Sequence, residues 1–418
     1  MMIYKSKEDD MSQLTKHGLG TLGSCFVVFI LAFSSLRGWA VLNLDIPAHS
    51  VYGFSSLLIL LLALYGFNCR YRFNGMRSSY LRSLFLINAL FGGYYLLGTL
   101  LLGSVPDISI FYIYLLPYIV FVFLRVDPSK LQLAIFFILL GISFSVIENY
   151  ISLVSGGSLS YMEEYNRKLR PMVFESLSHT NGYIRLGGYT GSYHDSANIL
   201  GIIGTYYFIS SIVTRKLYYG VLAMLAFFAI MLTQSAANIV LALLTSLVFA
   251  IPLWLKFKAK ITILFIVIFF MSALLVLAFP DLLVFTQRIS PEGDWDGMKN
   301  KLTLDVMWKS FSFWFGHGNA LGDDYAASEV AFLKCILEMG IIPACLLFYI
   351  LIYPVYLFLR LKVDSFQLTP YVAALAFGFV SLAHYGSLFR ITSIALFYTF
   401  YALFFQKLNS YQGAVVKK

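Results

Sequence analysis

The residues best suited to chemistry lie in two polar segments that interrupt a very apolar chain. In the first, Arg185 precedes a glycine-rich stretch, and the next apolar run opens with Tyr193, His194 and Asn198. Glycines let backbone N–H groups approach a ligand closely. A helix N-terminus attracts anions, and a neighbouring arginine suits phosphate. The pattern therefore indicates either a phosphate-binding site or a glycine-rich turn with a helix cap and an interfacial arginine.

The second polar segment begins with Arg288 and an acidic cluster, Glu292, Asp294 and Asp296. Carboxylates can bind a divalent cation, but this spacing does not match an EF-hand loop. We interpret the cluster as a solvated acidic turn and expect no metal site.

Further along this segment are two candidates for a general base. His317 stands between two glycines, and Glu329 opens the next apolar run at the water boundary. Histidine is the natural base near neutral pH, whereas partial withdrawal from water raises the pKa of a carboxyl group toward that range. We favour Glu329 as the base and expect His317 to shape an acceptor site.

The composition indicates the class of protein that holds these residues. The chain has 418 residues, of which 59% are hydrophobic and 12% charged, and its mean hydropathy is +0.78. A soluble domain carries about 25% charged residues, so a soluble enzyme and a disordered chain are both excluded. We expect an all-α polytopic membrane protein, with residues 1–418 forming one transmembrane domain.

Apolar runs of about 20 residues predict twelve transmembrane helices. Two long loops separate them, at about 154–193 and 281–334, and these hold the candidate site residues. The predicted spans are about 19–41, 50–68, 83–103, 108–124, 131–153, 194–213, 217–233, 237–255, 261–280, 335–359, 369–388 and 391–407.

The net charge of +9 comes mostly from Lys and Arg in short loops between apolar runs. This is the positive-inside pattern of membrane proteins and not a nucleic-acid patch, so we expect no nucleic-acid partner. It predicts that both termini are cytoplasmic and that both long loops lie outside, in the periplasm.

Three local patterns resemble the bacterial O-antigen polymerase and O-antigen ligase families. Arg185, small residues and then Asn198 near a helix start resemble the first family element. The stretch Phe313-Trp-Phe-Gly-His-Gly-Asn319 resembles a second, and Ser328-Glu329 through Glu338-Met-Gly-Ile-Ile342 resembles the helix that follows it. The elements come in the family's order, and the expected topology is similar along the whole chain.

The sequence departs from the family pattern in two places. Ligases of this family usually have a histidine near the position of Glu329, which favours a polymerase here. Many members carry a Thr-x-Ser-Arg turn, whereas this chain reads Thr233-Gln-Ser-Ala-Ala-Asn238, with Ala236 in place of the arginine.

The resemblance implies a membrane-embedded, metal-independent glycosyltransferase of the bacterial inner membrane, with no cofactor. Its donor would be a glycan on undecaprenyl diphosphate, and its acceptor the next lipid-linked repeat unit. The implied substrate-binding residues are Arg185, Arg288, His194, Asn198 and Tyr193, and membrane lipid and a chain-length regulator protein are the other expected partners.

Two alternatives stay open. An O-antigen ligase would transfer the glycan to lipid A core instead, and a lipid-linked oligosaccharide flippase or another transporter would also fit twelve spans. Transporters tend to place polar residues at mid-membrane, whereas here they collect in the outside loops.

Overall fold

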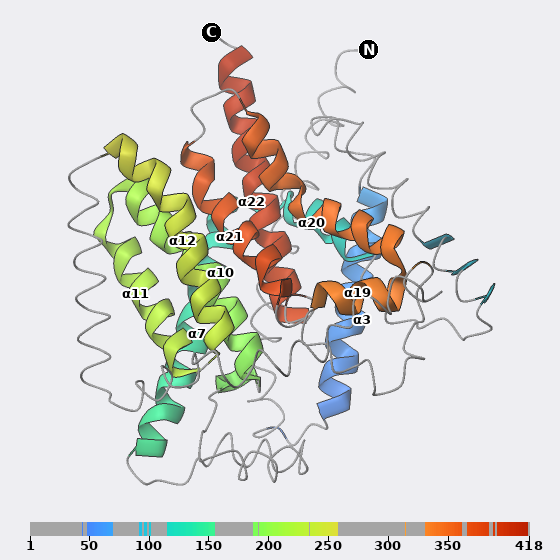
Figure 1. Ribbon diagram of the computed structural model, residues 1–418, viewed down its shortest axis with the longest axis horizontal. Coiled ribbons are helices and arrows are strands. Elements are labelled where there is room, and N and C mark those ends of the chain that lie inside the picture. Colours follow the sequence, from blue (N-terminus) through green and yellow to red (C-terminus); the bar gives the residue numbers. More distant parts are fainter. Residues whose placement is uncertain are drawn as a thin grey trace, which may run out of the picture.

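The computed structural model describes residues 44, 48–69, 92–93, 96–97, 100–101, 115–154, 187–190, 192–233, 235–257, 314, 331–361, 366–383, 388 and 391–416. Within these residues every regular element is a helix, and the helices pack side by side as a bundle (Figure 1). The α-helices and the 3-10 helices (η) are α3 (Ala48–Cys69), η2 (Leu116–Tyr118), α6 (Ile119–Phe123), α7 (Pro128–Val154), η3 (Gly188–Thr190), α10 (Tyr193–Thr214), α11 (Leu217–Leu232), α12 (Ala236–Phe257), α19 (Ala331–Met339), α20 (Ile341–Arg360), η6 (Phe366–Leu368), α21 (Thr369–Val380), η7 (Ser381–Ala383) and α22 (Ile391–Val416).

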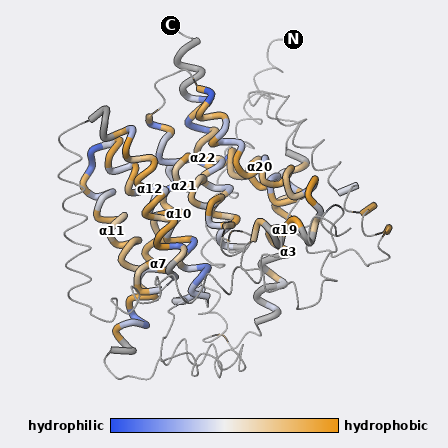
Figure 2. The backbone as a smooth tube through the Cα atoms, viewed as in Figure 1, coloured by the Kyte–Doolittle hydropathy of each residue, from blue (hydrophilic) through white to orange (hydrophobic). Residues whose placement is uncertain are grey.

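Four helical stretches of the described chain are long and apolar enough to cross a membrane. Their middles are hydrophobic, and hydrophilic residues gather toward the helix ends (Figure 2). This pattern indicates a membrane protein, because a spanning helix needs about 20 apolar residues. The four stretches are Pro128–Ile151, Tyr193–Thr214, Ile341–Arg360 and Phe366–Ala383.

The start of α7 follows from three consecutive residues. Asp127 Oδ1 accepts hydrogen bonds from the Ser129 backbone N–H and the Ser129 hydroxyl, each at 2.8 Å. Pro128 occupies the first helical position, where its missing N–H costs nothing. The bonds from Ser129 hold the pKa of the Asp127 carboxyl below its ordinary value. Such a cap fixes the residue at which the helix begins.

Helix α10 is the centre of the bundle and packs against α7, α11, α12, α21 and α22. Small residues let its neighbours approach closely. A Cβ added to Gly204 would lie 3.1 Å from the Cβ of Ala226 on α11, and a Cβ on Gly201 would meet the ring of Phe377 on α21. The glycines of α10 therefore set how near α11 and α21 can lie.

Helices α10 and α22 run in the same direction, and α21 runs against both of them. Phe397 of α22 packs on Gly378 of α21. Further along, the ring of Tyr206 on α10 lies 4.9 Å from Phe400 of α22 and 5.4 Å from Tyr371 of α21, measured between ring centroids. These contacts fix the relative register of the three helices.

The outer face of α12 is apolar and exposed, as expected of a surface that meets lipid. A row of aliphatic side chains lies there, opposite the face that packs on α10. Its members are Val240, Leu243, Leu244, Leu247, Val248 and Ile251.

Five of the predicted spans are confirmed as helices. α3, α7, α10, α11 and α12 begin and end within three residues of the expected bounds. The spans expected over 19–41 and 261–280 lie outside the described residues. The last expected span, 391–407, corresponds to α22, which continues to Val416.

The span expected over 335–359 is confirmed over most of its length as α20, but its first turns belong to a separate helix. The chain forms α19, breaks at Gly340 and restarts as α20. Gly340 has φ of +87°, which a residue with a side chain rarely adopts. Pro343, in the first turn of α20, lacks the N–H that would continue the earlier helix. Only α20 is long enough to cross a membrane.

Candidate functional site

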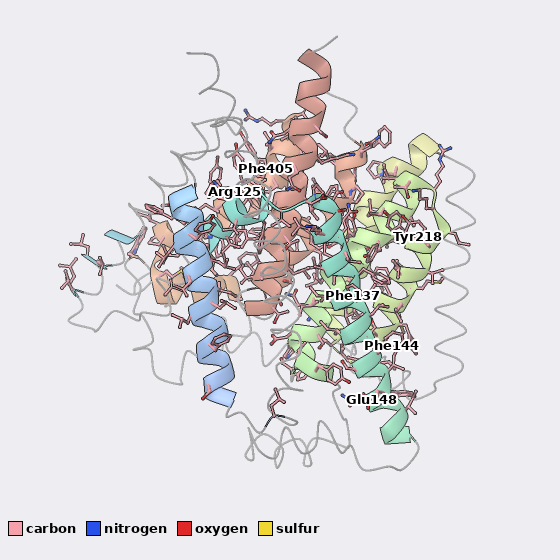
Figure 3. All side chains as sticks on the ribbon, turned by 180° about the vertical axis from the view of Figure 1, so that it is seen from behind. Arg125, Phe137, Phe144, Glu148, Tyr218 and Phe405 are labelled. Atoms are coloured by element: carbon pink, nitrogen blue, oxygen red, sulfur yellow. The ribbon has the colours of Figure 1, made fainter. Side chains whose placement is uncertain are left out.

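The two ends of the bundle differ in charge. One end, here called the basic end, carries all the Lys and Arg residues whose side chains the structure describes. Gln406 of α22 reaches this end, where its Nε2 donates to the carbonyl of Val126 at 2.8 Å. Figure 3 places Arg125 at this end and Glu148 at the other. The members of the basic end are Arg125, Lys130, Arg215, Lys216, Arg360 and Lys407.

The opposite end, here called the polar end, is formed by the C-terminus of α7 and the N-termini of α10, α12 and α22. Its buried polar residues come from four helices that are far apart in the sequence. They include Asn149, Asp195, Asn198, Asn238 and Ser393, each less than 7% exposed. The predicted site residues that the structure describes all lie at this end.

A polar turn covers the start of α10. The hydroxyl of Thr190, in η3, lies 2.9 Å from the Gly187 carbonyl and 2.7 Å from the hydroxyl of Ser196. The Ser196 hydroxyl also donates to the Gly187 carbonyl. Thr190 and Ser196 are both buried, so this network folds the glycine-rich turn back onto the first turns of α10.

The same turn is tied to α7. The backbone N–H of Tyr189 donates to Ser145 Oγ at 3.1 Å, and the Tyr189 hydroxyl donates to Glu148 Oε2 at 3.5 Å. Partial burial, together with the nearby Glu148 carboxylate, raises the pKa of Tyr189 above its ordinary value. Gly188 has φ of +54°, and a Cβ there would meet Ser145 Oγ. This position therefore requires glycine for two separate reasons.

The N-terminus of α10 is already capped. Ser192 Oγ accepts the backbone N–H of Asp195 at 3.4 Å. The Asp195 carboxyl is itself buried in the first turn, at 2% exposure. An acidic side chain at this place occupies the position where a helix N-terminus favours an anion. The first turn of α10 is therefore less suited to phosphate than its sequence indicates.

Tyr193, His194 and Asn198 lie together in the first two turns of α10. The rings of Tyr193 and His194 are 3.8 Å apart between centroids, and both residues are partly buried. Asn198 is fully buried, and neither its Nδ2 nor its Oδ1 makes a hydrogen bond to the described part of the chain. Four other predicted site residues, Arg185, Arg288, His317 and Glu329, lie outside the described residues.

The turn between α11 and α12 is polar but satisfied by local bonds. Asn238 Nδ2 donates to Ser235 Oγ at 3.0 Å, and the Ser235 N–H donates to Thr233 Oγ1 at 3.4 Å. The Thr233 hydroxyl donates to the Ile230 carbonyl at 2.6 Å. These local hydrogen bonds account for the polar residues of this turn, which connects the two helices.

Asn149 and Ser393 are polar residues of this end that were not predicted from the sequence. Ser393, in the first turn of α22, is fully buried, and its hydroxyl finds no partner in the described residues. The signal in the sequence is the polar pair Thr392-Ser393 at the start of an apolar run. In the sequence this pair is typical of an ordinary helix start. Only the tertiary packing places it beside α10.

Across the ranges that the structure describes, no three or more His, Cys, Asp and Glu side chains come together as metal ligands. A comparison of the chain with models of known protein families, with curated proteins and with solved structures gives no match.

Proposed function

We propose that the chain is a polysaccharide repeat-unit polymerase of the bacterial inner membrane. It transfers a glycan from undecaprenyl diphosphate onto the next lipid-linked repeat unit at the periplasmic face. The observation that carries the proposal is the separation of the two bundle ends, with buried polar side chains at one and cationic side chains at the other.

The charge separation supports the proposed orientation. Short loops rich in Lys and Arg stay in the cytoplasm, so the basic end is the cytoplasmic one. The polar end then faces the periplasm, together with the two long loops that the sequence analysis predicts. A glycan that has already crossed the membrane would be processed on that side.

The kinds of polar group at the polar end also support a carbohydrate substrate. Asn198 and Ser393 each offer a donor and an acceptor without carrying charge. Sugars are dense in hydroxyl groups, which donate and accept hydrogen bonds at the same time. Neutral side chains of this type therefore suit the glycan, and a different part of the site has to bind the diphosphate.

In the proposed reaction, an acceptor hydroxyl oxygen attacks the anomeric carbon of the donor glycan. The bond from that carbon to the diphosphate oxygen breaks, and undecaprenyl diphosphate leaves with the electron pair. Glu329 takes the proton of the acceptor hydroxyl, with His317 as the second candidate for this role. Arg185 and Arg288 stabilise the leaving diphosphate, because planar guanidinium groups pair with phosphate oxygens in a bidentate way.

Deletion of the gene in its own host tests the proposal against the ligase and the transporter. A missing polymerase leaves a single repeat unit on the lipid core, seen as one short band when lipopolysaccharide is separated on a gel. A missing ligase leaves an unsubstituted core while lipid-linked polymer accumulates. A missing flippase leaves an unsubstituted core and only single lipid-linked repeat units. Restoring the gene on a plasmid is the control in each case.

A further inference from the structure

Two buried polar side chains on different helices, Asn198 of α10 and Ser393 of α22, find no hydrogen-bond partner within the described residues. Both residues have an exposed fraction of 0%. The unpaired atoms are Nδ2 and Oδ1 of Asn198 and Oγ of Ser393. A buried polar group without a partner is costly, and most such groups in folded proteins are paired. Such unpaired groups are therefore candidates for contact with a ligand, as are Ser143 Oγ and Gln406 Oε1 elsewhere in the bundle.

The helix register places these two residues at the same height in the bundle. Ile202 of α10 and Phe397 of α22 both contact Gly378 of α21, so these three residues share one level. Asn198 is four residues before Ile202, and Ser393 is four residues before Phe397. Because α10 and α22 run in the same direction, both residues lie about 6 Å nearer the polar end.

Asn198 lies on the face of α10 that packs against α21. Residues three and four apart lie on the same face of a helix. Asn198 is therefore in line with Gly201 and Ile202, which meet Phe377 and Gly378 of α21, respectively.

Ser393 lies on the face of α22 that packs against α21 and α10. It is in line with Phe397, which meets Gly378 of α21, and with Phe400, whose ring packs on Tyr206 of α10. Asn198 and Ser393 thus lie at a similar level on two helices that both pack against α21, and their side chains form no hydrogen bond to each other.

We propose that Asn198 and Ser393 together bind one hydroxyl group of the lipid-linked glycan, an assignment that rests on the proposed function. The amide N–H donates to the hydroxyl oxygen, and the serine oxygen or the amide oxygen accepts its proton. A phosphate oxygen only accepts, so it would leave the Asn198 carbonyl oxygen unpaired.

Asn238 provides an internal comparison. It lies near the N-terminus of α12 and is also buried, but its amide donates to Ser235 Oγ. A buried asparagine at the start of a helix therefore finds a local partner in this fold where its role is structural. Asn198 has no such partner in the described residues, so its amide is free of the local role that Asn238 has.

Substitution of Ser393 separates binding from a structural role. The full-length protein is purified, and its substrate is the lipid-linked repeat unit extracted from cells that lack the gene. Ser393→Ala removes one hydrogen bond to the glycan, so the KM for this substrate rises about 3- to 10-fold while kcat changes less. The thermal unfolding temperature without substrate stays the same or rises, because a buried unpaired hydroxyl has been removed.

Ser211→Ala is the matched control. Ser211 is a buried serine of α10 near the basic end, and its hydroxyl donates to the Phe208 carbonyl at 2.7 Å. The same change of side chain there leaves the KM unchanged. An unchanged KM in Ser393→Ala as well would overturn the proposal and leave an ordered water as the occupant.

Asn198→Leu, which keeps the branched shape of the side chain but is larger and lacks both hydrogen-bonding groups, tests the other half of the site. A binding measurement without turnover keeps the two proposals apart. The lipid-linked repeat unit raises the unfolding temperature of the wild type, and this rise shrinks in Asn198→Leu and Ser393→Ala. If the ligand stabilises the wild type in this selective way but no chain grows, the polymerase proposal fails and the hydroxyl site stands. An equal rise in all three proteins contradicts the hydroxyl site, even if chains grow.

Discussion

Gly201 of α10 lies directly against the ring of Phe377 of α21, with no room for a side chain between them. We predict that Gly201→Ala destabilises the protein by about 1–3 kcal/mol, because the ring would have to shift in a packed core. Phe377→Leu should recover part of this loss in the double variant. Unfolding in detergent measures all three proteins, and strictly additive losses would show that the two residues do not interact.

Gly188 is the second position where glycine is required, at the turn that joins α7 to the start of α10. Gly188→Ala should weaken this turn by about 1–2 kcal/mol through its left-handed backbone alone, and further through the clash with Ser145 Oγ. Ser145→Ala in the same chain removes the clash with Oγ but not the backbone penalty, and it also loses the hydrogen bond from the Tyr189 N–H, so rescue should be partial. Full rescue by Ser145→Ala would mean that the backbone conformation contributes nothing.

The proposed orientation predicts which engineered cysteines an impermeant thiol reagent reaches in intact inner-membrane vesicles of known sidedness. The four native cysteines are first replaced by alanine. In right-side-out vesicles, Ser160→Cys in the first long loop should react. Leu217→Cys, exposed beside Arg215 and Lys216, should react only after the membrane is opened. The reverse pattern would place the polar end in the cytoplasm and contradict the proposed reaction side.

Arg185 and Arg288 should each be required for polymer formation, since they neutralise the leaving diphosphate. Arg→Ala at either position should abolish long-chain polysaccharide, with the protein still present in the membrane at wild-type level. Arg→Lys should restore activity only in part, because lysine keeps the charge but not the planar, bidentate geometry. Full activity in both lysine variants would indicate plain interfacial anchoring, and full activity in both alanine variants would remove the arginines from the mechanism.

Much of the bundle could be predicted because local signals mark its helices. The Asp127-Pro128-Ser129 sequence indicates the start of α7, and a long apolar run predicts its length. Around Gly340, by contrast, apolar residues continue on both sides, so hydropathy alone does not reveal the break between α19 and α20. The glycine and the proline three residues later were the available signal.

The candidate site could be predicted only where its residues are close in the sequence. Tyr193, His194 and Asn198 share the first two turns of α10, so their proximity follows from helix geometry. Ser393 lies 195 positions beyond Asn198, and no local pattern links them. Their relationship comes from close packing of α10, α21 and α22 through Gly201 and Gly378, which is a tertiary property.

The most direct test of the account uses the purified full-length protein, the lipid-linked repeat unit and a metal chelator. The account predicts that chains lengthen and that one undecaprenyl diphosphate is released for each linkage formed. It also predicts that Glu329→Gln, which keeps the shape of the side chain but removes the base, lowers this rate about 100-fold or more. Unchanged turnover in Glu329→Gln with loss in His317→Ala would move the role of base to His317. If the wild-type protein neither lengthens chains nor releases undecaprenyl diphosphate, the central claim is contradicted.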